Sequence, residues 1–263
     1  MKNAIVIPCY NESERLPFEL FKTFLTSHSD FVCCFVNDGS KDDTLTKLQA
    51  FQLSIGNQVI IYDMPQNGGK AEAVRAGVSR MLEISSVQTI GFLDADLATG
   101  FDDYKCLLSS LVENTLSMTF GSRKLDSCAD IDRSFFRDSM SKAIGLMIST
   151  MLNLPIKDTQ CGAKVFSRQA AATVFADGFI SKWLFDVEIF FRMKRLFAQQ
   201  VMTEISEIPL QAWNDVEGSK LGLKDVLQIP LMLSKIAFAN ALVPQTEVLI
   251  KSLTKRTAVS QAA

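Results

Sequence analysis

The chain has 263 residues, of which 48% are hydrophobic and 21% are charged, and its formal net charge at pH 7 is −2. This length suits one α/β domain with a C-terminal extension. The overall field of a nearly neutral chain does not attract a polyanion, so nothing in the composition indicates nucleic-acid binding, and any phosphate site must be built from particular Arg and Lys residues.

The cysteines and the histidine exclude further classes of protein. The six cysteines form no CxxC pair, and three of them lie inside apolar, strand-like runs, so we expect reduced, buried thiols rather than a disulfide framework. The one histidine, His28, rules out a His-rich metal site, and its place in a Ser-rich helix end is typical of the surface rather than of a Ser-His-Asp hydrolase. The sequence shows no secretory signal, which predicts a cytoplasmic location.

The first half of the chain alternates short β-branched runs with helical patterns, which predicts βα units that feed a mostly parallel sheet. The predicted strands are Ala4–Pro8, Phe31–Asn37, Gln58–Asp63, Thr89–Asp94 and Met118–Ser122. The predicted helices are Phe18–Ser27, Asp42–Gln52, Lys70–Ile84 and Asp102–Glu113. Polar residues gather at the strand ends, and ligands of open α/β sheets bind beyond the carboxyl ends of the strands.

The second half is less regular. It predicts helices at Ser134–Leu152 and Phe185–Arg195 and strands at Ala163–Ser167 and Thr203–Pro209. We expect a main domain over residues 1–222, a helical extension over 223–253 and a frayed tail over 254–263. The apolar segment Ile229–Val243 is shorter than the roughly 20 residues of a membrane-spanning helix, so we predict no such helix.

Two carboxylates, Asp94 and Asp96, follow the fourth predicted strand with one residue between them. Such a pair can hold a hard divalent cation, Mg²⁺ or Mn²⁺, against a diphosphate. The alternative is that one Asp caps the next turn and the other is solvated. The spacing alone leaves both interpretations open.

The ends of the first two predicted strands are also polar. Tyr10 can stack on a nucleobase, and Asp38 can accept a hydrogen bond from an imide N–H or a ribose hydroxyl. The simpler interpretation is a tight turn for Gly39 and Ser40 and a helix N-cap for Asp42.

A further polar segment, Asn67-Gly68-Gly69-Lys70, precedes a predicted helix, so its N–H groups and its lysine can face a phosphate or a carboxylate. It is not a Walker motif, because the earlier glycine is missing and Ala71 replaces the Ser or Thr. A GxGxxG fingerprint is also missing after the first strand, which disfavours an NAD-dependent dehydrogenase as well as a P-loop NTPase.

Four of these segments together resemble the family 2 inverting glycosyltransferases of the GT-A fold: Ile7–Glu12, Asn37–Ser40, Asn67–Ala71 and Asp94–Asp96. Later segments are similar to the dolichyl-phosphate β-glucosyltransferases: Gly121–Arg123, Arg133–Arg137, Asp158–Lys164, Trp183–Glu188, and Trp213 followed by Gly218–Leu221. The resemblance covers about Asn3 to Val226. It implies an α/β fold of the GT-A type, with a mostly parallel central sheet flanked by helices.

The resemblance also implies roles for individual residues. By this resemblance, Pro8, Tyr10, Glu12 and Asp38 contact the nucleoside, and Asp94 and Asp96 contact the metal and the diphosphate. Lys70 lies near the donor. Candidate phosphate contacts are Arg123, Arg133, Arg137 and Lys220, and Asp186 is an acceptor-side acid. Asp186, Arg123 and Lys220 are the catalytic candidates. Related mannosyltransferases often place Gln where this chain has Ala98, so we expect leaner metal coordination, completed by water.

These roles imply a metal-dependent hexosyltransferase that uses Mg²⁺ or Mn²⁺ and moves glucose from UDP-glucose to a polyprenyl or dolichyl phosphate. The alternatives are a family 2 transferase that acts on a saccharide or another small acceptor, and a non-catalytic nucleotide-sugar binding protein. A phosphate acceptor is already largely anionic at neutral pH and needs little help from a base, whereas a sugar hydroxyl would make Asp186 the base.

Eukaryotic members of the family carry an N-terminal membrane anchor that this sequence lacks, so the resemblance implies peripheral contact with a membrane. One candidate surface is an apolar stripe on the helix predicted at Ser134–Leu152. Its residues are Phe136, Met140, Ala143, Ile144, Met147, Ile148 and Met151. The segment Leu223–Val243 is a second candidate. The competing interpretation of both is core or a dimer interface.

Overall fold

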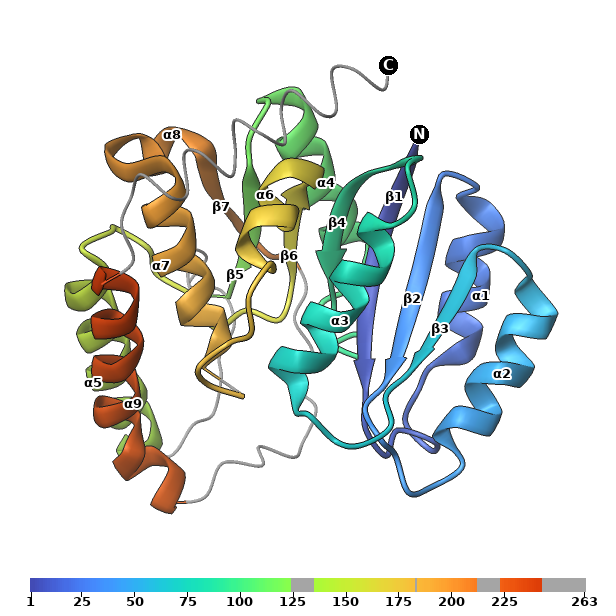
Figure 1. Cartoon of the computed structure of the whole chain (residues 1–263), viewed down its shortest axis with the longest axis horizontal. Helices are drawn as coiled ribbons and strands as arrows, with labels where there is room; N and C mark the ends of the chain where they lie inside the picture. The colour runs from blue at the N-terminus through green and yellow to red at the C-terminus, as the bar shows by residue number, and fades with distance from the viewer. Residues whose placement is uncertain (124–134, 183, 212–222, 243–263) are drawn as a thin grey trace.

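The structure, a computed structural model, describes residues 1–123, 135–182, 184–211 and 223–242. In the helices that begin at Phe135 and Leu223, side chains are described from Ile144 and Gln228 onward. The described chain forms a seven-stranded sheet in the order β3-β2-β1-β4-β6-β5-β7, with helices on both faces (Figure 1).

The strands are β1 (Lys2–Cys9), β2 (Phe31–Asn37), β3 (Val59–Asp63), β4 (Val87–Phe92), β5 (Met118–Ser122), β6 (Lys164–Ser167) and β7 (Ile205–Pro209). The helices of the first half are α1 (Phe18–Ser27), α2 (Thr44–Ile55), α3 (Lys70–Leu82) and α4 (Phe101–Glu113). Those of the second half are α5 (Phe135–Leu152), α6 (Arg168–Val174), α7 (Phe185–Phe197), η1 (Ala198–Gln200), α8 (Val201–Glu204) and α9 (Leu223–Leu242). Every predicted strand and helix is present, and most of them have ends shifted by a few residues.

Two features of the second half differ from the prediction. The short helix α6 was not predicted, because its seven residues are Ala-rich and carry no apolar period; Ser167 caps it by accepting a hydrogen bond from the Ala170 N–H at 3.3 Å. The strand predicted from Thr203 begins at Ile205, because the turn before it is helical as α8. Strand propensity at Thr203 is overridden by this local helix.

The sheet is mostly parallel, as predicted, with one exception that shapes the site. Strand β6 runs antiparallel between β4 and β5, and its first residue, Lys164, pairs with Phe92 of β4 and Phe120 of β5. The chain that leads into β6 therefore meets the chain that leaves β4 and β5. Segments far apart in the sequence come together at this edge.

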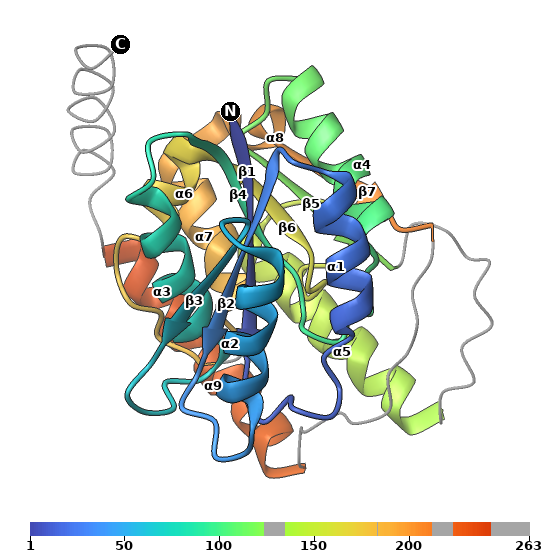
Figure 2. The ribbon, with the colours of Figure 1, turned by 90° about the vertical axis from the view of Figure 1, so that its right-hand side faces the viewer.

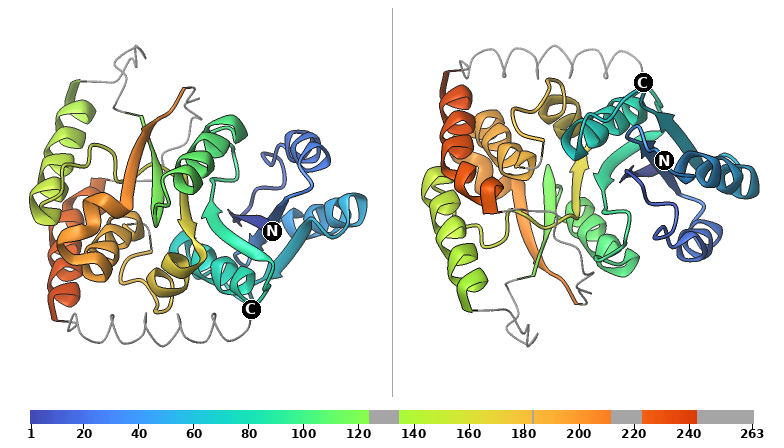
Figure 3. Two further views of the ribbon diagram at one scale, coloured as in Figure 1. Left: turned by 90° about the horizontal axis from the view of Figure 1, so that it is seen from above. Right: turned by 90° about the horizontal axis from the view of Figure 1, so that it is seen from below.

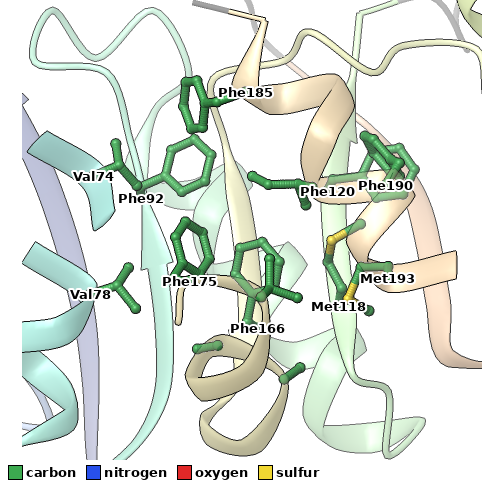
Figure 4. Close-up of a cluster of buried hydrophobic side chains, with 14 of the residues drawn as sticks. Val74, Val78, Phe92, Met118, Phe120, Phe166, Phe175, Phe185, Phe190 and Met193 are labelled. Atoms are coloured by element: carbon green, nitrogen blue, oxygen red, sulfur yellow. The ribbon is translucent and has the colours of Figure 1, made fainter. Parts of the chain in front are cut away.

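Alternating apolar residues along the strands build a core on each face of the sheet. In β1, Ala4 and Val6 point to the face covered by α3 and α7, whereas Ile5 and Ile7 point to the face covered by α1, α2 and α4. Figure 2 shows α3 and α1 on opposite sides of the sheet. In Figure 4, aromatic rings of the first core, among them Phe92, fill the space between strands and helices.

Helices α5 and α9 pack against each other beyond α7, at the end of the molecule remote from α2 (Figures 1 and 3). In the described part of α5, the apolar stripe proposed as a membrane surface is core: Ile148 is buried, and Ile144, Met147 and Met151 pack against the core. The prediction that this stripe contacts a membrane is therefore wrong for these four residues, because α7 and α9 cover them. Phe136, Met140 and Ala143 lie outside the described side chains.

Candidate active site

Those predicted site residues that the structure describes gather where β1, β2, β4 and β5 end, along the lower edge of the sheet in Figure 1. The loops after β1 and β2 bind each other there. The Asn11 N–H donates to Ser40 Oγ at 3.0 Å, and the Glu12 N–H donates to Thr44 Oγ1 at 2.9 Å. The Glu12 carboxylate also pairs with Arg15 at 2.7 Å. These bonds fix the segment that carries Pro8, Tyr10 and Glu12.

Asp42 ties the start of α2 to the same loop. Its carboxylate accepts hydrogen bonds from the Thr44 N–H at 3.1 Å and from the Ser13 N–H at 3.1 Å. Burial acts to raise the pKa of Asp42, but the donors on Thr44 and Ser13 outweigh it and hold that pKa well below its usual range. The N-cap position of α2 is Asp43, so the N-cap prediction for Asp42 is wrong by one residue. Asp42 still accepts the first N–H of the helix and ties it to the neighbouring loop.

Asp38, which follows β2, is buried and binds the loop before α3. Its carboxylate accepts hydrogen bonds from the Gly68 N–H at 2.6 Å, the Gly69 N–H at 2.9 Å and the Asn67 side chain at 3.1 Å. Burial raises the pKa of Asp38, and the two N–H donors offset part of that rise. The sequence left open whether these N–H groups face a phosphate or a carboxylate. In the structure they face the carboxylate of Asp38. The contact of Asp38 with a nucleoside stays a prediction.

The turn between β2 and α2 requires glycine. Gly39 has φ +62°, and a Cβ added there would lie 2.6 Å from the Asn67 N atom. The chain thus passes so close to the loop before α3 that a side chain would push the two segments apart. The tight-turn interpretation of Gly39 is confirmed.

Asp94 and Asp96 follow β4 and have different partners. Asp94 Oδ1 lies 2.5 Å from Lys70 Nζ, and a Cβ on Gly162 would overlap the other oxygen, Asp94 Oδ2. Asp96 Oδ1 accepts a hydrogen bond from the Ala98 N–H at 3.0 Å, across a turn in which Leu97 has φ +52°. Asp96 therefore forms the turn that the simpler interpretation predicted, while Asp94 faces a cation.

Lys70 is the cation at the centre of this edge. Burial lowers its pKa, but the nearby carboxylates of Asp94, Asp186 and Asp96 outweigh burial and raise it. Lys70 is therefore positively charged at neutral pH, at the N-terminus of α3. Both features favour a bound anion.

The carboxylates of Asp94 and Asp96 are suited to bind a divalent cation that also contacts the phosphates of a substrate. No three His, Cys, Asp or Glu side chains form a metal-binding group within the described residues. Mg²⁺ usually keeps several waters and binds one or two carboxylates together with substrate phosphates, which needs no third protein carboxylate. Asp94 and Asp96 match this donor set, and Ala98 has no side-chain oxygen to add.

Arg123, at the end of β5, is half-buried and belongs to a network of charged groups around the buried Asp158. Its Nε and Nη2 donate to the Asp158 carboxylate at 2.7 and 2.9 Å. The N–H groups of Lys157 and Asp158 in turn donate to the Glu207 carboxylate at 3.0 and 2.8 Å. Burial lowers the pKa of Arg123, and Asp158 more than offsets it, so the pKa is raised. The contact of Arg123 with a phosphate stays a prediction.

Asp186 lies in the first turn of α7, where only 4% of it is exposed. Its Oδ1 is 2.5 Å from Nζ of Lys164, which is 0% exposed. The sequence reasoning assigned no role to Lys164. The available signal was a lysine in the otherwise apolar run Ala163 to Phe166, where a buried charge needs a partner.

Lys182 is a second residue that the sequence reasoning missed. Its carbonyl accepts the Ala71 N–H at 3.1 Å, its charge acts on Asp38, and its side chain would be 3.1 Å from a Cβ on Gly69, which has φ +88°. Arg192 holds the loop that carries Lys182, because its guanidinium donates to the carbonyls of residues 174, 177 and 178. Lys182 thus brings a further cation to this edge.

Several predicted residues cannot be placed. Arg133, Trp183, Trp213, the segment Gly218–Leu221 and with it Lys220 lie outside the described residues. Arg137 lies in α5, but its side chain is not among those described. The roles of Arg133, Arg137 and Lys220 therefore stay predictions.

Residues 4–175 match the family described as Glycosyl transferase family 2. A dolichyl-phosphate beta-glucosyltransferase of Trichomonas vaginalis is 31% identical over 250 residues, which cover 89% of the chain and 72% of that protein. Proteins of the same description from Mus musculus and Saccharomyces cerevisiae are both 32% identical, over 83% and 84% of the chain and 69% of each relative.

Solved structures are similar in fold. Glucosyl-3-phosphoglycerate synthase from Mycobacterium tuberculosis, in complex with Mn²⁺ and uridine-diphosphate-glucose, has a TM-score of 0.65 at 14% identity and covers 92% of the chain and 80% of its own. Its complex with phosphoglyceric acid has a TM-score of 0.64 at 13% identity, over 92% and 81%. At this identity the likeness concerns the fold alone.

Proposed function

Because the chain belongs to glycosyl transferase family 2 and has the GT-A fold, we propose that it transfers glucose from UDP-glucose to a polyprenyl or dolichyl phosphate, with inversion at the anomeric carbon. The similar proteins of Trichomonas, mouse and yeast, described as dolichyl-phosphate beta-glucosyltransferases, support this acceptor. The observation that carries the proposal is the meeting of Lys70 with Asp94 at the end of β4. A diphosphate and a divalent cation would both find partners there.

On the donor side, Pro8, Tyr10, Glu12 and Asp38 would hold the nucleoside, and Lys70 and Lys182 would face the diphosphate. Asp94 and Asp96 would hold Mg²⁺ or Mn²⁺, which when bound stabilises the charge of the departing diphosphate. Lys70 would add its positive charge to the same group. Because Lys70 occupies Asp94 Oδ1, we expect it to move toward the diphosphate when donor and metal bind.

On the acceptor side, the phosphate oxygen would attack the anomeric carbon from the face opposite the leaving diphosphate. This single displacement inverts the configuration. The second pKa of a phosphate monoester is about 6, so the attacking oxygen is already anionic at neutral pH. Arg123, Arg133, Arg137 and Lys220 would contact the phosphates, and Asp186 would orient the acceptor.

Calorimetric titration tests the donor half of this proposal. We expect UDP-glucose to bind more tightly than GDP-mannose, and only with Mn²⁺ or Mg²⁺ present. Asp96→Ala should lose most of the metal-dependent affinity, because one of the two carboxylates is gone. Transfer of labelled glucose to undecaprenyl phosphate tests the acceptor half. A protein that binds no nucleotide, or hydrolyses and transfers nothing, would contradict the proposal.

We also propose a peripheral membrane contact, carried by α9 rather than by the stripe on α5. Ile229, Leu233 and Ile236 are buried on the inner side of this helix. On its outer side Leu231, Phe238 and Leu242 are exposed, Phe238 at 66%, and they follow the helical repeat together with the exposed Lys235. An apolar face with a cation suits a bilayer surface that contains anionic lipid. None of the described helices has the length and apolar character needed to cross a membrane.

Vesicle co-sedimentation tests this surface. With vesicles of phosphatidylcholine and phosphatidylglycerol, we expect the wild type to sediment and Leu231→Ser/Phe238→Ser to stay in the supernatant, because the apolar area that enters the bilayer is lost. Leu53→Ser is the matched control, since Leu53 is 88% exposed on α2, far from α9. A wild type that does not sediment, or a double variant that sediments equally well, would refute the contact.

A further inference from the structure

Lys164 is a fully buried lysine at the acceptor side of the candidate site. Its Nζ lies 2.5 Å from Asp186 Oδ1 and 2.7 Å from the Cys161 carbonyl oxygen. The rings of Phe92 and Phe190 flank the ammonium, with centres 5.5 and 5.8 Å away. The ammonium is therefore held on several sides, and among the described residues its close anionic contact is with Asp186.

The strand neighbours of Lys164 carry no charge. The residues that pair with Lys164 in the sheet, Phe92 and Phe120, are both buried and apolar. Removing an ammonium from water is costly, and a buried ion pair is often no more stabilising than apolar side chains of the same volume. The reason for this lysine therefore lies in what it does to Asp186.

The ion pair borders the donor side of the site. Asp186 is one of the carboxylates that raise the pKa of Lys70, after Asp94. Lys70 itself pairs with Asp94, and Lys164 begins the strand that lies beside the end of β4. Two cations and two carboxylates thus stand next to each other, where the transferred sugar would sit between diphosphate and acceptor.

We propose that Lys164 is a positioning residue, which holds Asp186 as the anionic half of a buried ion pair so that Asp186 orients the acceptor and takes no proton from it. This rests on the proposed sugar transfer. A proton on Asp186 would leave the Lys164 ammonium buried without an anionic partner. The pair also cancels the charge of Asp186, so that an anionic acceptor is not repelled.

The proposal restricts the acceptor class to groups that arrive already ionised, such as phosphate monoesters. The acceptor oxygen uses its own electron pair to form the bond to the anomeric carbon. The bond from that carbon to the diphosphate breaks, and its electron pair leaves with the diphosphate. No proton is transferred in this step. An alcohol acceptor would need a base, and Asp186 is already committed to Lys164.

The test compares the wild type with Lys164→Met, Asp186→Asn and the neutral pair Lys164→Met/Asp186→Asn. Transfer from UDP-glucose to undecaprenyl phosphate gives kcat and the acceptor KM, and calorimetry gives the affinity for UDP-glucose. We expect Lys164→Met to raise the acceptor KM roughly 30-fold, because its partner is left unpaired, with donor affinity unchanged. Asp186→Asn should lose about tenfold in kcat, far less than the roughly 10²–10⁴-fold that removal of a general base costs.

The neutral pair should recover the acceptor KM to within about tenfold of the wild type, because two neutral side chains replace two matched charges. A thousandfold loss of kcat in both Asp186→Asn and the neutral pair, with donor binding intact, would overturn the proposal and identify Asp186 as a base. If Lys164→Met does not fold, the other two variants decide the question.

Failure of the proposed function gives a different result, since the wild type then transfers no glucose to undecaprenyl phosphate. In that case thermal unfolding of the four proteins still tests the ion pair. If the neutral pair is much more stable than the sum of the two single-variant changes in unfolding free energy predicts, Lys164 does hold Asp186. If the changes simply add, that role is overturned.

Discussion

Replacing Gly162 with alanine is expected to abolish most metal-dependent UDP-glucose binding while the protein stays folded. The added Cβ would overlap Asp94 Oδ2, and that oxygen is the mobile end of a side chain, so the carboxylate can rotate away at little cost to the fold. A displacement of this kind near reacting groups costs roughly 100-fold in activity. Calorimetry with Mn²⁺ and UDP-glucose, together with kcat/KM for transfer, measures the effect.

Gly100→Ala is the matched control for this variant. Gly100 ends the loop between β4 and α4, which also carries Asp94 and Asp96; it has φ −75°, and a Cβ there meets no atom within 4 Å. We expect it to bind donor like the wild type. If Gly162→Ala also binds Mn²⁺ and UDP-glucose normally, Asp94 does not hold the metal and the proposed donor site is wrong.

Replacing Asp158 with alanine is expected to lower the free energy of unfolding by about 2 kcal/mol, because the half-buried Arg123 guanidinium loses its charged hydrogen-bond partner. Asp158 is buried and accepts from the Arg123 guanidinium, the Arg123 N–H and the Gln160 N–H. Urea denaturation measures the change. Glucose transfer should fall as well, because Arg123 would no longer be held at the end of β5.

Two further proteins make this result interpretable. Asp102→Ala breaks an exposed pair with Lys105 and should leave urea denaturation unchanged, since surface pairs contribute little. Arg123→Leu/Asp158→Ala should recover part of the stability lost in Asp158→Ala, because the unpaired guanidinium is gone. Equal stability of Asp158→Ala and Asp102→Ala would show that the pair of Arg123 with Asp158 contributes nothing.

The strands of the sheet could be predicted from the sequence because their signals are local. Phe31–Asn37 and Met118–Ser122 have the predicted bounds. Both are short runs of buried residues that end at polar turns, a pattern that a strand within a βα unit produces by itself. The helix α6 escaped prediction for the same reason, since its seven residues carry no periodic signal of their own.

The location of the candidate site could also be predicted, but its internal contacts could not. Asp38 and Asp94 lie at strand ends, as expected from the rule that places ligands there. Whether the Gly68 and Gly69 N–H groups face a phosphate or a carboxylate depended on how closely the loops after β2 and β3 approach. The structure brings Asp38 to them, and local sequence contains no measure of that approach.

The sequence by itself determined the type and order of the strands and of the longer helices, the family resemblance and the edge of the sheet that carries the polar residues, because periodicity and turn chemistry act over a few neighbouring residues. The tertiary structure alone decided which charges pair: Lys164 with Asp186, 22 residues away, and Arg123 with Asp158, 35 residues away. Both pairs depend on β6 lying antiparallel between β4 and β5. That register is set by packing over the whole sheet, which no short segment encodes.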